Sequence, residues 1–222
     1  AGNNVAIGYR ASSSSTTANS NTIIGQLAGS SLTTGSDNIF IGLLAGAHAV
    51  AATTAYQNVL IGGYSDVTAV GTANANVLGY NVSGAQDYTT LGNGANDIRA
   101  AHGNITWATV SDVRVKKDIE DSTVGLNFIN DLRPVTFNYK NKGDLPTEFR
   151  GYEEDSTEVY KSEKSQHGFI AQEVKAAIDK HSNIKDGFSM WDDDDETGQQ
   201  RVGETALIPV MTKAIQELST QV

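Results

Sequence analysis

Two residues at the middle of the chain have types that could act together on a peptide bond: Ser111 and Lys116. A serine hydroxyl is a poor nucleophile until a base removes its proton, and a neutral lysine amine can be that base. Burial in apolar surroundings or a neighbouring cation favours the neutral amine. The pair could be a lysine-activated serine, but the spacing taken alone is more typical of a solvated basic turn.

The residues around the pair restrict how it could be assembled. Arg114 and Lys117 are neighbouring cations, and Asp112 directly follows the serine. A five-residue offset puts two side chains on opposite faces of a straight strand and on different sides of a helix. The pair therefore requires a bend between Ser111 and Lys116, or a contact between two chains.

The composition excludes several classes of partner. The chain of 222 residues carries a net charge of -10, which argues against nucleic acid because binding to phosphates needs a basic patch. It has no cysteine, so disulfides and cysteine-based metal sites are excluded. No apolar run approaches the roughly 18 residues of a membrane span. We expect no nucleic-acid partner, no membrane span and no cofactor.

The two halves of the chain differ sharply. Residues 1–110 hold two basic and four acidic residues, whereas residues 111–222 hold the other 14 basic and 22 acidic residues and all three prolines. Such a shift is typical of a domain boundary. We therefore predict a repeat domain over 1–110 and a second domain over 111–222. The abrupt start and the helical pattern at the end lead us to expect a piece of a longer polypeptide.

The first half repeats a unit made of a polar residue, a short apolar run and a glycine. The closing glycines are Gly8, Gly25, Gly42, Gly62, Gly79 and Gly92, spaced by 17, 17, 20, 17 and 13 residues. A near-fixed period predicts stacked strand-and-turn units. Strand alternation puts Val5 with Ile7, and Ile39 with Ile41, on common faces. Because small residues dominate, we expect one copy to have little core and to need other chains to bury these faces.

This repeat resembles the left-handed β-roll heads of trimeric adhesins and the triple-stranded β-prisms of phage fibres. The resemblance covers roughly residues 3–95 and implies a homotrimer. A monomeric β-solenoid is the alternative. The many Ser, Thr and Asn side chains would also suit a surface that binds a host cell-surface glycan, although no residue marks a sugar site.

The second half reads as a mixture of helices and strands. Residues 105–110 predict a strand leading into Ser111. Ser122 could begin a helix that ends before Pro134, and residues 134–139 alternate as a strand. The polar stretches 140–166 and 185–203 predict long loops or extended arms.

The end of the chain has the spacing of a coiled-coil seam. Apolar residues step by 3, 4, 3 and 4 at Ile208, Met211, Ile215, Leu218 and Val222. A single amphipathic helix packed on its own domain is the alternative. The acidic run 192–196 lacks the pattern of a calcium loop, and consecutive carboxylates are usually solvated, so we expect no metal site.

Three motifs together resemble the intramolecular chaperones at the C-terminus of endosialidases and other phage tail spikes. They are the stretches 111–119 (SDVRVKKDI), 132–137 (LRPVTF) and 167–174 (HGFIAQEV). The resemblance implies that Ser111 and Lys116 are a self-cleaving dyad. It also implies extended arms that grip a neighbouring fibre and a final helical bundle. Asp112, Arg114, Lys117 and His167 are possible supporting residues, with a structural role as the alternative for His167.

The chemistry of serine indicates which bond would break. Attack of the Ser111 hydroxyl on the carbonyl of Val110 passes through a five-membered ring and gives an ester, so cleavage falls between Val110 and Ser111. Attack on the serine's own carbonyl would need a strained four-membered ring. Cleavage between Ser111 and Asp112 remains the alternative and would require another nucleophile, such as activated water.

The sequence therefore predicts a trimeric β-roll or β-prism fibre followed by an α+β chaperone domain that ends in a coiled-coil helix. This domain would trimerise, align the fibre strands and release itself as an autocatalytic serine peptidase. We expect the protein in the tail fibre, spike or appendage of a phage virion, assembled in the host cytoplasm. Two alternatives are a trimerisation module that does not cleave and a bacterial trimeric adhesin that binds host glycans.

Overall fold

The computed structural model describes residues 2–193 and 196–221, and the chain divides into two compact units, residues 1–117 and 118–222. Each unit has a hydrophobic core of its own. The division falls after Lys117 rather than before Ser111. The physical reason is that the junction stays against the last strands of the first unit, where Ala108 pairs with Arg99.

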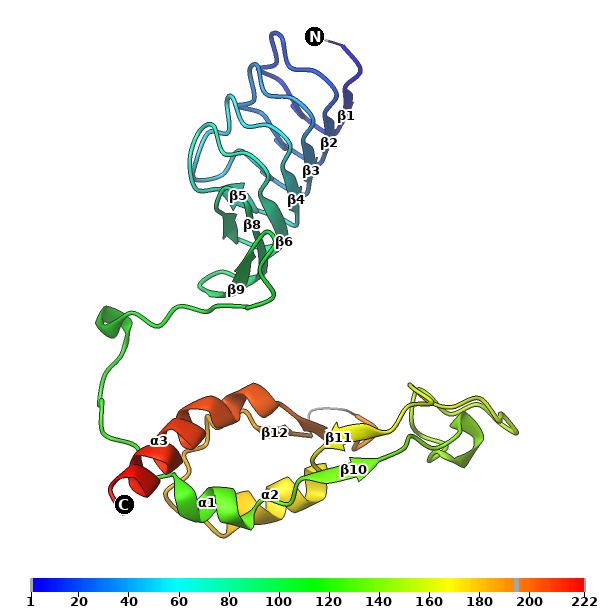
Figure 1. Cartoon of the computed structure of the whole chain (residues 1–222). Coiled ribbons are helices and arrows are strands. Elements are labelled where there is room, and N and C mark those ends of the chain that lie inside the picture. The colour runs from blue at the N-terminus through cyan, green and yellow to red at the C-terminus, as the bar shows by residue number, and fades with distance from the viewer. Residues whose placement is uncertain (1, 194–195, 222) are drawn as a thin grey trace. The chain divides into compact units, whose positions relative to one another are not determined.

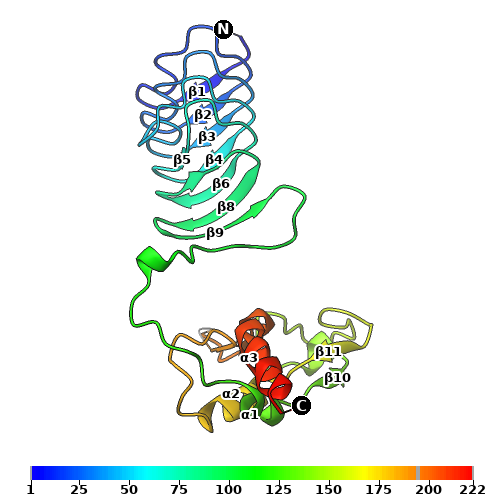
Figure 2. The ribbon, with the colours of Figure 1, turned by 60° about the vertical axis from the view of Figure 1, so that its left-hand side comes forward.

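The first unit is a β-solenoid of stacked coils (Figure 1; Figure 2). Its main sheet has seven strands in the order β1-β2-β3-β4-β6-β8-β9, and only the last pairing is antiparallel. The strands are β1 Val5–Ile7, β2 Thr22–Ile24, β3 Ile39–Ile41, β4 Val59–Ile61, β6 Asn76–Tyr80, β8 Tyr88–Asn93 and β9 Asn96–Ala101. Two short strands, β5 Asp66–Val67 and β7 Ser83–Gly84, pair in a second sheet.

Strands β2, β3 and β4 each bury their middle residue and leave the two residues beside it partly or fully exposed. Ile23, Phe40 and Leu60 are fully buried, as strand alternation predicts. The expectation that one copy has little core is wrong. Small side chains let the coil walls approach closely, and the buried cluster joins Ala18, Ile23, Ala28, Leu32, Phe40, Ala45, Ala52, Ala55, Leu60, Val67, Val77 and Val82.

A ladder of asparagines ties successive coils together inside the solenoid. The Oδ1 of Asn21 accepts hydrogen bonds from the backbone N and the Nδ2 of Asn38, both at 3.0 Å. Asn38 accepts the same pair from Asn58, and Asn4 accepts it from Asn21. Since a buried amide without partners is costly, the ladder favours stacking of like coil on like coil.

The repeated glycines form one corner of the solenoid. Gly25 has φ +135°, and a Cβ there would lie 2.4 Å from the carbonyl oxygen of Gly42 in the next coil. Only glycine allows both this backbone conformation and this approach. The glycine of the repeat is therefore required by coil stacking.

The second unit is an α+β domain. Its helices are α1 Leu126–Asp131, α2 Ala171–Asp179 and α3 Leu207–Ser219, and its strands are β10 Val135–Phe137, β11 Gln166–Gly168, β12 Trp191–Asp192 and β13 Arg201–Val202. The strands form two antiparallel pairs, β10 with β11 and β12 with β13. Short 3-10 turns lie at η2 Lys142–Asp144 and η3 Glu204–Ala206.

The core of this unit joins residues that are far apart in the sequence. Phe128 of α1 and Val174 of α2 are buried with Leu207 of α3. The predicted helix begins at Leu126 rather than at Ser122, because the carboxylate of Glu217 accepts a hydrogen bond from the Leu126 backbone N at 2.8 Å. Glu217 lies on α3, so the last helix fixes the start of the first (Figure 2).

The long polar stretch between β10 and β11 doubles back on itself. Asn141 pairs with Val159, and the Lys142 amine contacts the carboxylates of Glu153 and Glu158. Within the acidic run 192–196, Asp194 and Asp195 lie outside the described residues, as does Val222 at the end of the predicted seam. Among the described helices, none has the length and apolar character needed to cross a membrane.

Candidate active site at the junction

A single 3-10 turn bends the chain between the predicted serine and lysine. This turn, η1, covers Val113–Val115, and Asp112 caps it by accepting a hydrogen bond from the Arg114 backbone N at 2.9 Å. At its other end the Lys116 backbone N–H donates to the Val113 carbonyl at 3.1 Å. The turn supplies the bend that a five-residue offset requires.

Asp112 and Arg114 also form an ion pair across this turn. Arg114 Nε donates to Asp112 Oδ1 at 2.9 Å, and Nη2 donates to Oδ2 at 2.7 Å. This hydrogen bonding holds the pKa of the Asp112 carboxyl below its ordinary value of 3.8. The Asp112 carboxylate therefore holds the Arg114 guanidinium at the turn and partly offsets its charge.

The turn brings the two predicted residues together. The Lys116 Nζ lies 2.7 Å from the Ser111 Oγ, a hydrogen-bond distance at which a neutral amine could accept the hydroxyl proton. Both side chains are exposed in the single chain, and Lys117 beside them is exposed as well. The geometry thus brings the Lys116 amine and the Ser111 hydroxyl into hydrogen-bond contact, at a place that is open to water.

The segment before the serine is held by the last strand of the solenoid. Ala108 and Arg99 exchange two backbone hydrogen bonds, of 2.9 and 2.8 Å, and the Thr109 Oγ1 donates to the Asp97 carbonyl at 3.1 Å. An open cavity of about 570 Å³ lies beside this segment, lined by residues that include Leu91, Ile98, Val110 and Val115. The strand predicted over residues 105–110 is wrong, because only Ala108 pairs with β9, in an isolated bridge. A single bridge leaves no periodic pattern in the sequence.

His167 belongs to the paired strands β10 and β11 of the second unit. It lies in β11 opposite Thr136 of β10, and it lines a cavity with Glu204. The second and third motifs are therefore paired strands of one hairpin. They are also linked by Arg133, whose guanidinium binds the Glu173 carboxylate through Nε and Nη2. These contacts give both motifs a structural role.

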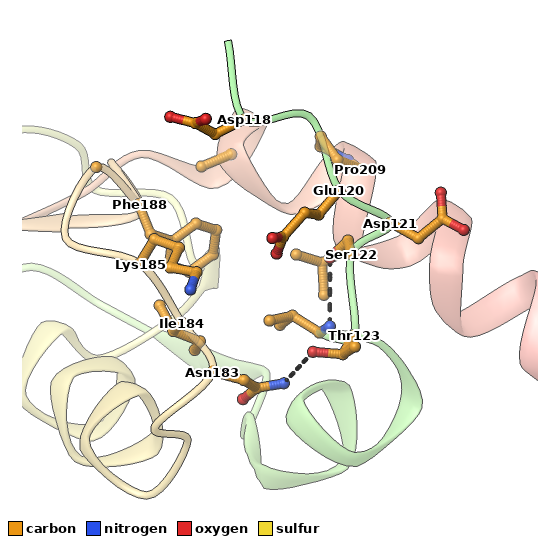
Figure 3. Close-up of a pocket in the computed structure, with 14 residues that line it drawn as sticks. Asp118, Glu120, Asp121, Ser122, Thr123, Asn183, Ile184, Lys185, Phe188 and Pro209 are labelled. Atoms are coloured by element: carbon orange, nitrogen blue, oxygen red, sulfur yellow. Dashed lines mark hydrogen bonds between the residues drawn. The ribbon is translucent and has the colours of Figure 1, made fainter.

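An acid-rimmed cavity of about 560 Å³ lies in the second unit (Figure 3). Its apolar floor includes Ile184 and Phe188, with Val210 from α3. Figure 3 shows the Glu120 carboxylate turned toward the cavity and the Asp121 carboxylate turned away from it. Sequence reasoning missed this cavity, because its walls come from three segments that are distant in the chain, 118–124, 183–188 and 206–210.

The last helix presents two apolar faces. Leu207, Val210 and Ala214 are buried against their own domain. The described residues of the predicted seam face outward and are 44–65% exposed, at Ile208, Met211, Ile215 and Leu218. The helix therefore packs on its own domain and still leaves a full apolar stripe uncovered.

A protein-family model matches the junction and the first part of the second unit. Residues 111–183 match the model of the peptidase family described as chaperone of endosialidase. This match confirms the resemblance of the motifs for that part of the chain and supports a chaperone role. The match begins at Ser111 and includes all three motifs, 111–119, 132–137 and 167–174. Searches of curated proteins and of solved structures gave no significant match.

Proposed function

We propose that residues 111–222 are an intramolecular chaperone that trimerises, aligns the three chains of a phage tail-spike or appendage fibre, and then releases itself by cleavage next to Ser111. The observation that carries this proposal is the 2.7 Å contact between Lys116 Nζ and Ser111 Oγ at the first residue of the chaperone-family match. The fibre would be the β-solenoid of the first unit.

The proposed reaction is an acyl shift followed by hydrolysis. Lys116 takes the proton of the Ser111 hydroxyl as the Oγ attacks the carbonyl carbon of Val110, and the C–N bond between Val110 and Ser111 breaks. The proton passes from Lys116 to the departing amine. Water then hydrolyses the ester, leaving a carboxylate on Val110 and restoring the serine hydroxyl. Attack of activated water on the Ser111–Asp112 bond is the alternative.

The proposed trimer supplies what the exposed dyad lacks. An ammonium in water stays protonated, whereas burial favours the neutral amine that can act as a base. Closure of partner chains over the junction would exclude water from Lys116. The two surfaces proposed for this association are the exposed stripe of α3 and the outward row of the solenoid sheet, which aligns Ile7, Ile24, Ile41, Ile61, Leu78 and Leu91.

The need for a chaperone follows from the repeat itself. Similar coils can stack in shifted registers, because the coils of β1 to β4 all offer an asparagine, an apolar central residue and a glycine at corresponding positions. Pairing of distant or separate segments is also slow. A trimerising domain raises the effective concentration of the three chains, and its later removal makes the assembled fibre kinetically stable.

The proposal is tested by intact-mass analysis of the purified wild-type chain beside Ser111→Ala, Lys116→Ala and Lys164→Ala. We expect the wild type and Lys164→Ala to appear as fragments 1–110 and 111–222, and the two dyad variants to stay whole. Lys164→Ala is the matched control because it removes an exposed lysine that is far from Ser111 in the sequence. Cleavage of Lys116→Ala at the wild-type rate would overturn the role of Lys116.

Two other functions remain distinct from this one. A trimerisation module that does not cleave would give a whole wild-type chain that is nevertheless trimeric. A bacterial adhesin would bind host glycans through its repeat half, for which the exposed Tyr9, Tyr56 and Tyr80 are candidate stacking surfaces. A glycan-array screen of the uncleaved Ser111→Ala chain separates this function from that of a virion protein whose repeat half serves only as a fibre.

A further inference from the structure

The terminal hairpin of the solenoid contacts the chain just before the proposed cleavage site. β8 and β9 are the only antiparallel neighbours in the main sheet of the described residues, and they close the stack of parallel coils. The outer edge of β9 pairs with Ala108 through both backbone hydrogen bonds of one bridge. The Thr109 hydroxyl adds a third hydrogen bond, to the Asp97 carbonyl. Residues 108 and 109 are thereby held against the end of the solenoid.

Apolar contacts continue this attachment on both sides of the serine. Val110 precedes Ser111, and Val115 precedes Lys116. Both valines line the open cavity whose other apolar walls are Leu91 of β8 and Ile98 of β9. The residue before the nucleophile and the residue before the base therefore face the same hairpin.

We propose that the β8–β9 hairpin is a substrate clamp, which holds Ala108–Val110 extended and so positions the Val110 carbonyl for attack by Ser111. This inference rests on the proposed function and adds a regulatory condition to it. The scissile segment is held only when the last solenoid coil has folded, because the clamp consists of that coil's own strands. Cleavage would then depend on folding of the fibre end as well as on the chaperone domain.

The physical basis is the loss of conformational freedom before the reaction. Ser111 and Lys116 are already joined by the η1 turn, so the remaining freedom lies in the carbonyl that must meet the hydroxyl. Anchoring the preceding residues reduces that freedom, and reactions of prepositioned groups gain large factors in rate. After cleavage the same bridge would keep residues 105–110 along β9, where they shield an open sheet edge from pairing with other chains.

The experiment compares two proline substitutions in the full chain. Ala108→Pro removes the N–H that donates to the Arg99 carbonyl, and it therefore breaks the bridge. Ile105→Pro makes the same chemical change three positions earlier, at a side chain that is 96% exposed, and leaves both bridge hydrogen bonds in place. We expect the cleavage rate, followed by intact mass, to fall at least about tenfold in Ala108→Pro and to stay near wild type in Ile105→Pro.

A second pair of variants, which disturb the backbone less, distinguishes loss of the clamp from misfolding. Ile98→Ser removes an apolar wall of the cavity, whereas Val70→Ser removes a similarly exposed apolar side chain that lies outside the strands of the solenoid; these side chains are 43% and 49% exposed. We expect only Ile98→Ser to slow cleavage, at unchanged oligomeric state by light scattering and unchanged unfolding temperature. A purely structural effect of the hairpin would lower the unfolding temperature together with the cleavage rate.

Exchange of backbone amide hydrogens with solvent measures the bridge between Arg99 and Ala108 directly. In the uncleaved Ser111→Ala chain the Arg99 amide should exchange slowly, and this protection should be lost when Ala108→Pro is added. The inference is overturned if the wild type cleaves and Ala108→Pro cleaves at the same rate. If the wild type does not cleave at all while trimeric, the proposed function itself has failed, and the clamp fails with it.

Discussion

The two units of this chain are stabilised in opposite ways. In the solenoid each coil contacts the coil before and the coil after it, through the same residue types at each step, so contacts are local and interchangeable. In the second unit, called the chaperone unit below after the family match that begins at Ser111, α1, α2 and α3 meet in one core. Glu217 near the end of the chain accepts a hydrogen bond from the start of α1. The repeat therefore offers similar contacts at several registers, whereas the core of the second unit joins residues from three different helices.

The largest difference is expected when one buried aromatic residue is removed from each unit. Phe128→Ala should lower the stability of the chaperone unit by about 3–5 kcal/mol and abolish cleavage, because all three helices share that core. Phe40→Ala should destabilise the solenoid by a similar amount and leave the chaperone unit folded. Circular dichroism at helical and strand wavelengths during heating measures the two units separately. Loss of the helical transition in Phe40→Ala would contradict the comparison.

The asparagine ladder should give the next largest effect. Asn38→Ala leaves partners unpaired in both neighbouring coils, which should cost about 1–3 kcal/mol of solenoid stability. Asn93→Ala, at an exposed position, is the control and should be close to neutral. Denaturant unfolding followed by tyrosine fluorescence measures both. Equal stability of the two variants would show that the ladder contributes nothing to stacking.

The link between the first and last helices should have a smaller effect. Glu217→Ala removes the acceptor for the Leu126 N–H, so the chaperone unit should lose about 1 kcal/mol, a typical value for a helix cap. Gln216→Ala alters the adjacent exposed residue of the same helix and should change little. Thermal unfolding at constant protein concentration is the measurement. A solenoid destabilised by Glu217→Ala would argue against independent units.

Lowering the pH should give the smallest difference in stability between the two units. Hydrogen bonds from His181 and then Lys180 lower the pKa of Asp131 below its ordinary value of 3.8, and Arg133 lowers that of Glu173 below 4.5. Because these folded values are depressed, their stabilisation is present above the unfolded pKa and is lost as pH falls through the folded one. The helical transition should weaken below about pH 4.5, and Asp131→Asn should reduce that dependence. A chaperone unit equally stable at pH 6 and pH 3 would contradict this.

Much of the solenoid could be predicted from its sequence. The glycine spacing and the strand alternation at Ile39 and Ile41 indicated stacked strands, which the structure confirms. The interior could not be predicted, because many small residues predict little core, whereas Ala28 and Ala45 are part of the buried cluster. Composition reveals small side chains, but only the coil geometry shows how closely the opposite walls approach.

The junction and the chaperone unit could be predicted less completely. The bend between Ser111 and Lys116 followed from their spacing, yet the turn is set by Asp112 and Arg114, which a spacing argument does not reveal. The exposed stripe of α3 followed from its heptad pattern over the described residues. The cap from Glu217 and the bridge at Ala108 join distant segments, and no local pattern indicates such contacts.

The most direct test of the central claim is intact-mass analysis of the wild-type chain during refolding, with and without hydroxylamine, beside Ser111→Ala. The account predicts fragments 1–110 and 111–222 from the wild type. Hydroxylamine, which attacks esters, should convert part of the first fragment to a hydroxamate at Val110. Ser111→Ala should stay whole in both conditions. A wild-type chain that remains whole while it is trimeric would contradict self-cleavage, and would leave residues 111–222 as an assembly module alone.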